Sequence, residues 1–160
     1  SIRRVAPEMA SPRAKTHNYL NFVLGDLEVE AQNSDALSVL LDKNGNLAEG
    51  KGSNIFLIKD EKLVTPKEKY VLPGVSREVV IELSKILEYE MKEDDIDLFD
   101  AYNADEAFIT STSFCICPVQ SLNGRHLKAT EVPGPITTQL INSYIELVGF
   151  DWYSQYLSKL

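Results

Sequence analysis

The chain has 160 residues, enough for one ordinary domain or two small ones, and its 16 basic and 24 acidic residues give a net charge of −8. Nucleic acids and anionic membranes both attract basic surfaces, so this balance argues against either as a partner. No apolar run is long enough to span a bilayer, and residues 1–15 lack the apolar centre of a signal peptide. Cys115 and Cys117 stand too close in sequence to bridge within a strand or helix, which favours a reducing compartment, the cytoplasm.

The first part of the chain predicts a linker and a helix. Pro7 and Pro12 break helix, so residues 1–14 are expected to form an extended linker. Over residues 16–32 apolar side chains recur every three or four positions, the spacing of an amphipathic helix. The positions expected to face inward are Tyr19, Phe22, Val23, Leu27 and Ala31.

Strand signals follow, separated by turns. A β-type run over 36–42 and the Asn44-Gly45 pair after it predict a two-residue hairpin turn, with a return strand from 47 to 49. Further strands are expected at 53–59 and 62–65.

Two helices are predicted in the second half of the chain. The first opens at Ser76, whose hydroxyl suits an N-cap, and its apolar face comprises Val79, Val80, Leu83, Ile86 and Leu87. The second runs from 134 to about 148, and its inward residues are Ile136, Leu140, Ile141, Tyr144 and Leu147. The aromatic tail over 150–160 is expected to dock on the body of the protein.

Between these two helices the pattern returns to strands. A short strand is expected at 89–92, an acidic irregular stretch with one helical turn at 94–105, and strands at 106–110 and 114–121. Asn123-Gly124 marks a second hairpin turn. The order of helix, strands, helix, strands and helix indicates a single α/β (α+β) domain with a mixed sheet.

Two patterns that imitate metal sites are better explained by structure. Cys115 and Cys117 lack a second cysteine pair and a nearby histidine, so they are predicted to be same-face positions on a buried strand. Asp42, Asn44 and Asn46 imitate the start of a calcium loop, but the glycine and glutamate that such a loop requires further on are absent. No metal site is expected.

Residues 72–77, Leu-Pro-Gly-Val-Ser-Arg, are more informative. A Pro-Gly turn that leads into a helix points several backbone N–H groups and the positive end of the helix dipole at one spot. Such a spot can bind phosphate without a basic residue, and we call residues 72–77 the phosphate seat. Taken alone, the segment is explained better by an ordinary capped helix.

Three further groups favour the phosphate interpretation. Lys15 stands just before the first helix, and Glu49 lies in an unusual stretch beside Gly50 and Gly52, which allow close approach of a ligand or another chain. Residues 110–113 form a polar cluster between two apolar strands. A lysine, a lone carboxylate, a phosphate seat and a hydroxyl cluster are the parts that a pyridoxal phosphate enzyme needs.

Four motifs resemble a known family in order and spacing: RAKTHNYL (13–20), LAEGKGSNIFLIKD (47–60), LPGVSR (72–77) and FITSTSFCICPV (108–119). They are similar to the class IV aminotransferases, also called fold-type IV pyridoxal phosphate enzymes. These include branched-chain amino acid, D-amino acid and R-selective amine aminotransferases and aminodeoxychorismate lyase. The Asn18-Tyr19 pair and the LPGVSR form look most similar to the branched-chain and R-amine branch.

The resemblance implies the fold of the large domain of D-amino acid aminotransferase-like enzymes, a mixed sheet or pseudo-barrel with flanking helices, over residues 15–160. It also implies that Lys15 binds pyridoxal 5'-phosphate covalently and carries a proton between the substrate and the cofactor. Tyr19 would form a hydrogen bond with the phenolic oxygen of the cofactor, and Glu49 would accept a hydrogen bond from its pyridine nitrogen.

The resemblance further implies which residues hold the phosphate and the substrate. Cofactor contacts are expected from Leu72, Gly74, Val75, Ser76 and Thr112, with the backbone of Val75 and Ser76 and the hydroxyls of Ser76 and Thr112 on the phosphate. Ser111 and Ser113 beside Thr112 are expected to receive the substrate carboxylate.

One departure from the family concerns length. Family members are about twice as long, and their smaller first domain, which supplies a phosphate-binding arginine and helps to form a homodimer, has no counterpart in these residues. We therefore expect the cofactor-binding domain alone, from an enzyme that transfers an amino group from an amino acid, branched-chain type favoured, to a 2-oxo acid. A D-amino acid or R-amine transaminase, the lyase, and a fragment without activity of its own stay open as alternatives.

Overall fold

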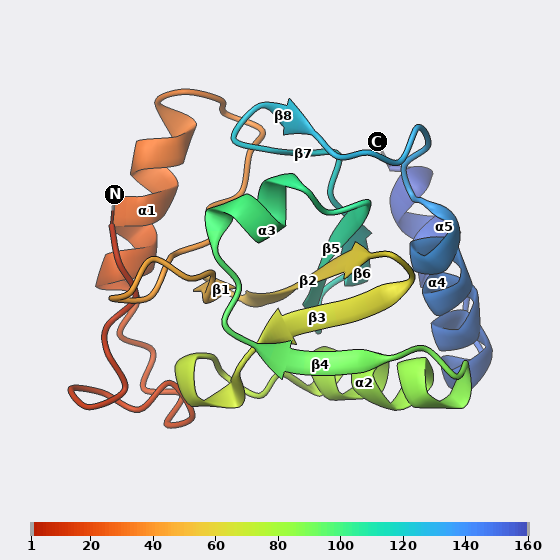
Figure 1. The fold of residues 1–160 in the computed structure, drawn as a ribbon, viewed down its shortest axis with the longest axis horizontal. Helices are drawn as coiled ribbons and strands as arrows, with labels where there is room; N and C mark the ends of the chain where they lie inside the picture. The colour runs from red at the N-terminus through yellow and green to blue at the C-terminus, as the bar shows by residue number, and fades with distance from the viewer. Residues whose placement is uncertain (1, 160) are drawn as a thin grey trace.

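The architecture is built on a mixed sheet. The computed structural model describes residues 2–159. Its six-stranded sheet has the order β4 (Met91–Asp94), β3 (Lys62–Pro66), β2 (Ser53–Lys59), β5 (Glu106–Ser111) and β6 (Cys115–Pro118), with β1 (Glu49–Gly50) paired to β2. The β3–β4 pair is parallel and the other pairs are antiparallel, so the predicted mixed sheet with flanking helices is confirmed (Figure 1).

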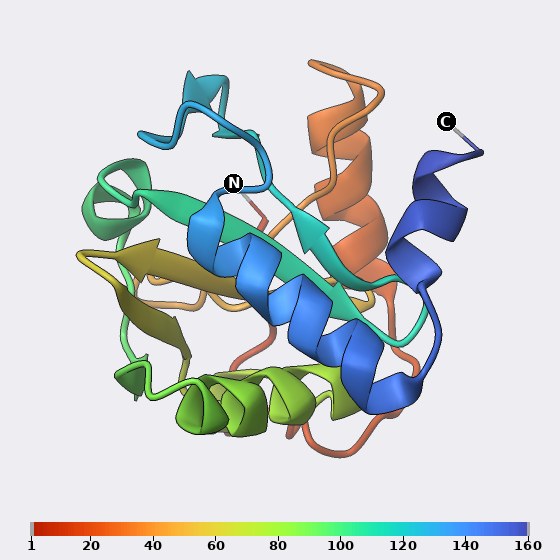
Figure 2. The same ribbon diagram turned by 90° about the vertical axis from the view of Figure 1, so that its right-hand side faces the viewer.

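Helices cover one face of this sheet. α2 (Val75–Ile86) and α4 (Pro135–Val148) lie side by side there, followed by the short α5 (Trp152–Leu157) (Figure 2). The buried side chains of this layer are Phe56, Ile58, Leu63, Val80, Ile81, Leu83, Phe108, Ile116, Ile136, Leu140, Ile141, Tyr144 and Trp152. Because burial of one such apolar side chain contributes about 1.5–3 kcal/mol, this layer firmly holds α2 and α4 in place.

The opposite face is covered by shorter segments. They are α3 (Leu98–Tyr102), the ribbon of β7 (Ser121–Leu122) and β8 (Arg125–His126), and the chain around residues 39–47. The second core comprises Leu47, Ile55, Leu57, Ile96, Ala101, Ala104, Ala107, Ile109 and Leu127. The central strands are therefore buried on both faces, which explains why they read as continuous apolar runs rather than as alternating ones.

The first helix differs from its prediction in length and in the face that it buries. α1 spans Leu20–Glu30 instead of 16–32, and of its predicted inward residues only Phe22 is buried. The exposed ones are Tyr19, Val23, Leu27 and Ala31. The helix rests on Phe22 and on Gly25, where a Cβ atom would lie 2.6 Å from Leu40 Cδ2. α1 stands at one end of the sheet (Figure 1), so the body of the protein covers only a narrow strip of it.

Two turn regions also correct the predictions. Residues 36–42 form no strand, only isolated bridges at Leu41, and the hairpin turn is longer than two residues, since Asp42 N–H donates to Asn46 O (2.7 Å). Ser76 is not the N-cap of α2, because Gly74 occupies that position and no side chain caps the helix. The turn geometry places the N-cap two residues earlier than hydroxyl preference suggests.

The cysteine prediction is wrong. The strand is short, and Cys115 packs against the first core while Cys117 packs against the second. Cys115 has a positive φ of 55°, which breaks the alternation that would put both thiols on one face. Both side chains are half-buried, and burial raises the pKa of each thiol.

The other predicted elements are close to those observed. The strands at 53–59, 62–65 and 106–110 agree within one residue, the strand predicted at 89–92 lies at Met91–Asp94, and the second hairpin forms at Asn123-Gly124. Ile86 and Leu147, predicted to face inward, are 73% and 60% exposed because they lie in the last turns of their helices. The tail docks through Trp152, as predicted, which contacts Tyr144 edge-on.

The start of α4 is tied to the sheet by a buried carboxylate. Glu106, on β5, accepts hydrogen bonds from Ile136 N–H (3.1 Å), Thr137 N–H (2.9 Å) and Thr137 Oγ1 (2.6 Å). The negative charge also suits the positive end of the helix dipole. These bonds fix the register of α4 against the sheet.

No helix within residues 2–159 is long and apolar enough to cross a membrane, and no group of three or more His, Cys, Asp or Glu side chains in that range could hold a metal ion.

Candidate functional site

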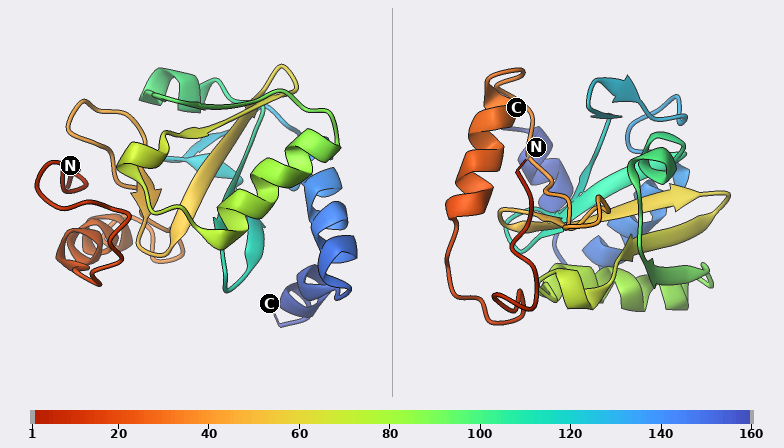
Figure 3. Two further views of the ribbon diagram at one scale, coloured as in Figure 1. Left: turned by 90° about the horizontal axis from the view of Figure 1, so that it is seen from below. Right: turned by 60° about the vertical axis from the view of Figure 1, so that its left-hand side comes forward.

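One cavity of about 360 Å³ brings the predicted site together. It is lined by most of residues 10–19, by 49–54, by the phosphate seat and by 110–112, together with Arg4 and Phe22. Figure 3 shows how the linker loops from α1 towards the start of α2. The predicted residues that line it are Lys15, Tyr19, Glu49, Leu72, Gly74, Val75, Ser76, Ser111 and Thr112. Ser113 lies beside the cavity but not in its lining.

Glu49 is a buried carboxylate with two donors. It is 5% exposed, its Oε1 accepts from Arg4 Nε (2.8 Å), and its Oε2 accepts from Leu72 N–H (2.8 Å). Burial raises the pKa of Glu49, against the opposing effects of the Leu72 N–H and of Arg4. A carboxylate has about four acceptor positions, so Glu49 can still accept a bond from a donor inside the cavity.

The phosphate seat presents unpaired donors. The N–H of Glu78 donates to Gly74 O (3.0 Å), whereas no group within residues 2–159 accepts from the N–H groups of Val75, Ser76 or Arg77. Unpaired N–H groups at a helix start, together with the helix dipole, attract an anion. The arrangement therefore suits a phosphate group.

A glycine makes this arrangement possible. A Cβ on Gly74 would lie 2.4 Å from Asn54 Oδ1, and the same amide donates its Nδ2 to Leu72 O (2.9 Å). Asn54, on β2, thus fixes the turn that leads into α2. Only a residue without a side chain can pass so close to the buried amide.

The end of β5 and the turn that follows it form a further part of the wall. Thr110 Oγ1 is buried and has no hydrogen-bond partner within the described chain. Ser111 O accepts from Ser76 Oγ (3.0 Å), which ties this turn to the phosphate seat. A buried hydroxyl without a partner at a cavity wall is costly unless a ligand or water satisfies it.

Lys15 and Tyr19 also line the cavity, in exposed positions. Among the residues that the structure describes, no carboxylate forms an ion pair with Lys15, whereas Lys51, on the same cavity, pairs with Asp26 (3.6 Å). The Tyr19 ring lies between His17 (centroids 5.7 Å apart) and Phe22 (6.3 Å). Lys15 is therefore an amine that faces the cavity without a competing acid.

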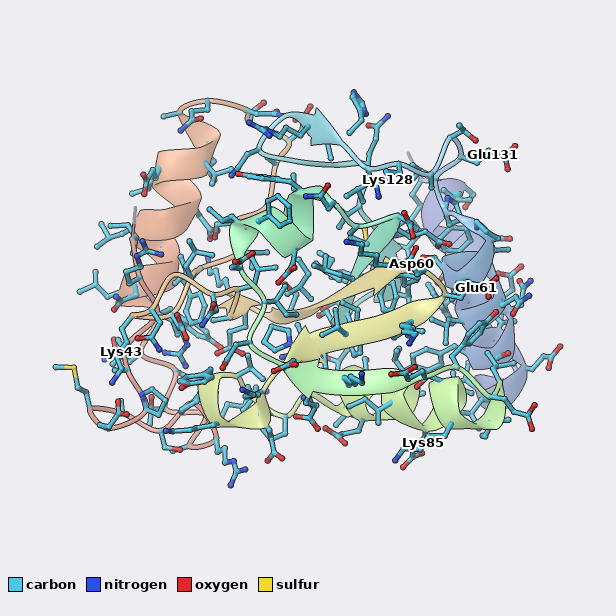
Figure 4. The ribbon with its side chains drawn as sticks, in the orientation of Figure 1. Lys43, Asp60, Glu61, Lys85, Lys128 and Glu131 are labelled. Atoms are coloured by element: carbon cyan, nitrogen blue, oxygen red, sulfur yellow. The ribbon has the colours of Figure 1, made fainter. Side chains whose placement is uncertain are left out.

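Six of the exposed charged side chains illustrate the surface outside the site. Figure 4 labels six exposed residues on turns, helix α2 and the loop before α4, and none of them lines the cavity: Lys43, Asp60, Glu61, Lys85, Lys128 and Glu131. They belong to the solvated surface.

Sequence reasoning missed Arg4, Phe22 and Asn54. An arginine in a linker and an asparagine in a strand carry no local signal of a site. Phe22 is buried, as its helical spacing predicts, but that spacing does not reveal that the guanidinium of Arg4 lies over its ring, 5.0 Å from the ring centre. These residues act by holding Glu49 and the phosphate seat in position.

The chain also matches a known protein family. The family described as Amino-transferase class IV matches residues 1–122. A branched-chain-amino-acid aminotransferase of Pseudomonas aeruginosa is 34% identical over 149 residues, which is 92% of this chain and 48% of that protein. The chain spans about half the length of the curated relatives that it matches.

Solved structures show the same likeness. The branched-chain amino acid aminotransferase of Thermobaculum terrenum, in its PLP form, matches with a TM-score of 0.84 and 36% identity over 92% of this chain and 48% of that one. The branched-chain aminotransferase of Thermoproteus uzoniensis, solved with norvaline, matches with a TM-score of 0.84 and 35% identity over 92% and 49%.

Proposed function

Because the chain belongs to the class IV aminotransferases, we propose that its cavity binds pyridoxal 5'-phosphate and that the whole protein transfers an amino group between an amino acid and a 2-oxo acid. The observation that carries this proposal is the meeting of three groups around one cavity. They are the amine of Lys15, which has no acidic partner among residues 2–159, the buried carboxylate of Glu49, and the N–H groups of the phosphate seat at the start of α2, which have no acceptor in that range.

The residues present fit this cofactor. The N–H groups of Val75 and Ser76, with the hydroxyls of Ser76 and Thr112, would hold its phosphate, while Leu72 and Gly74 shape the turn. The buried Thr110 Oγ1, which lacks a partner in the described chain, supports a polar ligand at this wall.

When bound, the cofactor supplies an aldehyde that captures amines and a ring that accepts electrons from the substrate Cα. Glu49 would hold a proton at the ring nitrogen, and Tyr19 would donate to the phenolic oxygen. Lys15 would hold the cofactor covalently and then, once freed, carry the proton that leaves the substrate Cα. Ser111, Thr112 and Ser113 would receive the substrate carboxylate.

The arrangement of the protein around this site extends the proposal. Residues 15–160 would form the cofactor-binding domain and 1–14 the linker, and the half of the relatives that this chain does not span would supply the rest of the pocket. A homodimer is the proposed assembly of the whole protein. Two half-buried free thiols suit the cytoplasm as the proposed compartment.

A branched-chain amino acid is the substrate that we favour, because the similar proteins named above bear that activity in their names. Assays with 2-oxoglutarate and, separately, L-leucine, D-alanine and R-phenylethylamine would test this in a protein of the relatives' full length. Preference for either of the last two donors would contradict it.

Cofactor capture by Lys15 can be tested on the chain itself. Added pyridoxal phosphate should give an absorption band near the visible edge, and borohydride reduction followed by peptide mapping should place the label on Lys15. The Lys15→Ala chain should lose both signals. Lys51→Ala is the matched control, since Lys51 lines the same cavity and should be dispensable. A label on Lys51 or Lys69 in the unchanged chain would refute the assignment.

A further inference from the structure

A buried tyrosine contacts the phosphate seat without lining the cavity. Tyr144, on α4, is 6% exposed, and its hydroxyl donates to Ser76 Oγ (3.3 Å). Ser76 Oγ in turn donates to Ser111 O (3.0 Å). Tyr144 does not line the cavity, and α4 lies outside residues 1–122 that the family matches. Tyr144 therefore acts on a ligand in the cavity indirectly, through Ser76; its hydroxyl also interacts with the Cys115 thiol, which does not line the cavity.

Each hydroxyl group has only one hydrogen, and this limits which group donates and which accepts in the contact between Tyr144 and Ser76. A serine hydroxyl has one hydrogen to donate and accepts through its lone pairs. When Tyr144 donates into Ser76, the hydrogen of Ser76 must point elsewhere. Its acceptor is Ser111 O, which belongs to the cavity wall, or a phosphate oxygen that takes that place.

Tyr144 itself is held in place on several sides. Its ring meets Trp152 edge-on with centroids 5.9 Å apart, and α4 is anchored to β5 by Glu106. Burial raises the pKa of Tyr144, so the phenol keeps its proton and stays a donor. From α5, the hydroxyl of Tyr156 donates to Ser113 O, which lies in the β5–β6 turn.

We propose that Tyr144 is a positioning residue for phosphate binding, which keeps the Ser76 hydroxyl oriented as a donor towards the cavity. This inference rests on the proposed function, since it concerns the phosphate of the same cofactor. It assigns a role in the site to α4, a helix that contributes nothing to the cavity lining.

The test compares two ligands that differ only in the phosphate. Dissociation constants for pyridoxal phosphate and for pyridoxal are measured by absorbance titration of the full 160-residue chain and of Tyr144→Phe. Loss of one neutral hydrogen bond should weaken pyridoxal phosphate binding about fivefold and leave pyridoxal binding unchanged. Thermal unfolding of both chains checks that the aromatic ring at position 144 still packs in the variant.

Two further variants separate positioning from packing. Tyr89→Phe is the matched control, because its hydroxyl also bonds to α4, at Gln139, but far from the seat, and it should bind both ligands as the unchanged chain does. In a Ser76→Ala background, Tyr144→Phe should cause no additional loss, because Tyr144 acts through that hydroxyl.

The outcomes distinguish this inference from the proposed function. Equal pyridoxal phosphate affinity in Tyr144→Phe and the unchanged chain overturns the role of Tyr144 alone. Equal losses for pyridoxal phosphate and pyridoxal also overturn it, since they would show a general structural effect. Failure of the unchanged chain to bind pyridoxal phosphate overturns both proposals.

Discussion

At the scale of single residues, Glu49 shows how a protein keeps a charge where burial opposes it. Its two oxygens each accept one bond, from a guanidinium and from a backbone N–H, yet burial still raises its pKa. Buried groups held in this way are frequent at sites where charge is used. Burial of the Glu49 carboxylate lowers the stability of the folded chain. We interpret this loss as the consequence of keeping an acceptor in place for the ring nitrogen of the proposed cofactor.

This loss of stability leads to a prediction for pH dependence. Because the pKa of Glu49 is raised above the ordinary value of 4.5 in the folded chain, its favourable contribution to folding is present below that value and is lost as pH rises through the folded pKa. The free energy of unfolding of the unchanged chain, relative to Glu49→Gln, should therefore fall as pH rises above about 4.5.

Urea unfolding of both chains at a series of pH values, without cofactor, measures this difference. Glu61→Gln, at an exposed position in the β2–β3 turn, controls for the loss of one acidic residue. A relative stability that rises with pH would show that Arg4 and Leu72 outweigh burial, contrary to the prediction.

At the scale of elements, the start of α2 depends on a backbone passing close to a buried amide. A methyl group on Gly74 must displace Asn54, whose Nδ2 bond to Leu72 O holds the turn. The N–H groups of the phosphate seat would then move with the turn. Correct placement of the helix start therefore depends on one strand residue and one glycine.

Gly74→Ala should weaken pyridoxal phosphate binding by about tenfold, as expected for loss or misalignment of a charge-assisted hydrogen bond. Gly52→Ala is the matched control: Gly52 lines the same cavity, but a Cβ there meets nothing within 4 Å. Titration with the cofactor measures both. Equal affinities for the two variants would show that Asn54 yields without moving the turn.

At the scale of the whole molecule, the described residues form two buried cores, whereas part of the proposed site is exposed. Two cores flank the sheet, which supports independent folding. Lys15, Tyr19 and Thr112, however, are exposed. Water at these positions weakens the electrostatic interactions on which the proposed reaction depends.

We therefore expect the 160-residue chain to fold and to capture the cofactor but not to transaminate. The chain is purified, its mass is checked to exclude a companion protein, and it is assayed with saturating pyridoxal phosphate, L-leucine and 2-oxoglutarate. Circular dichroism with cooperative thermal unfolding confirms folding. Turnover comparable to that of a full-length relative would show that this domain suffices.

Much of the fold could be predicted from local pattern. Helices α2 and α4 each bury an apolar face, and strands β2, β3 and β5 each bury an apolar run. The spacing of apolar residues in the sequence therefore predicts these elements. The motifs at 13–20, 47–60, 72–77 and 108–119 indicated the candidate residues. That step depended on resemblance, because a lysine or a glutamate alone has no distinctive local pattern.

The tertiary structure decided what depends on distant partners. The Arg4–Glu49 pair joins residues 45 apart, and the Tyr144–Ser76 contact joins residues 68 apart, so neither leaves a periodic trace in the sequence. For α1, spacing revealed an apolar stripe but not which strip would be covered, because that depends on the neighbour that packs against it. The sequence by itself determined the elements and the chemical groups; only packing determined which groups face one another.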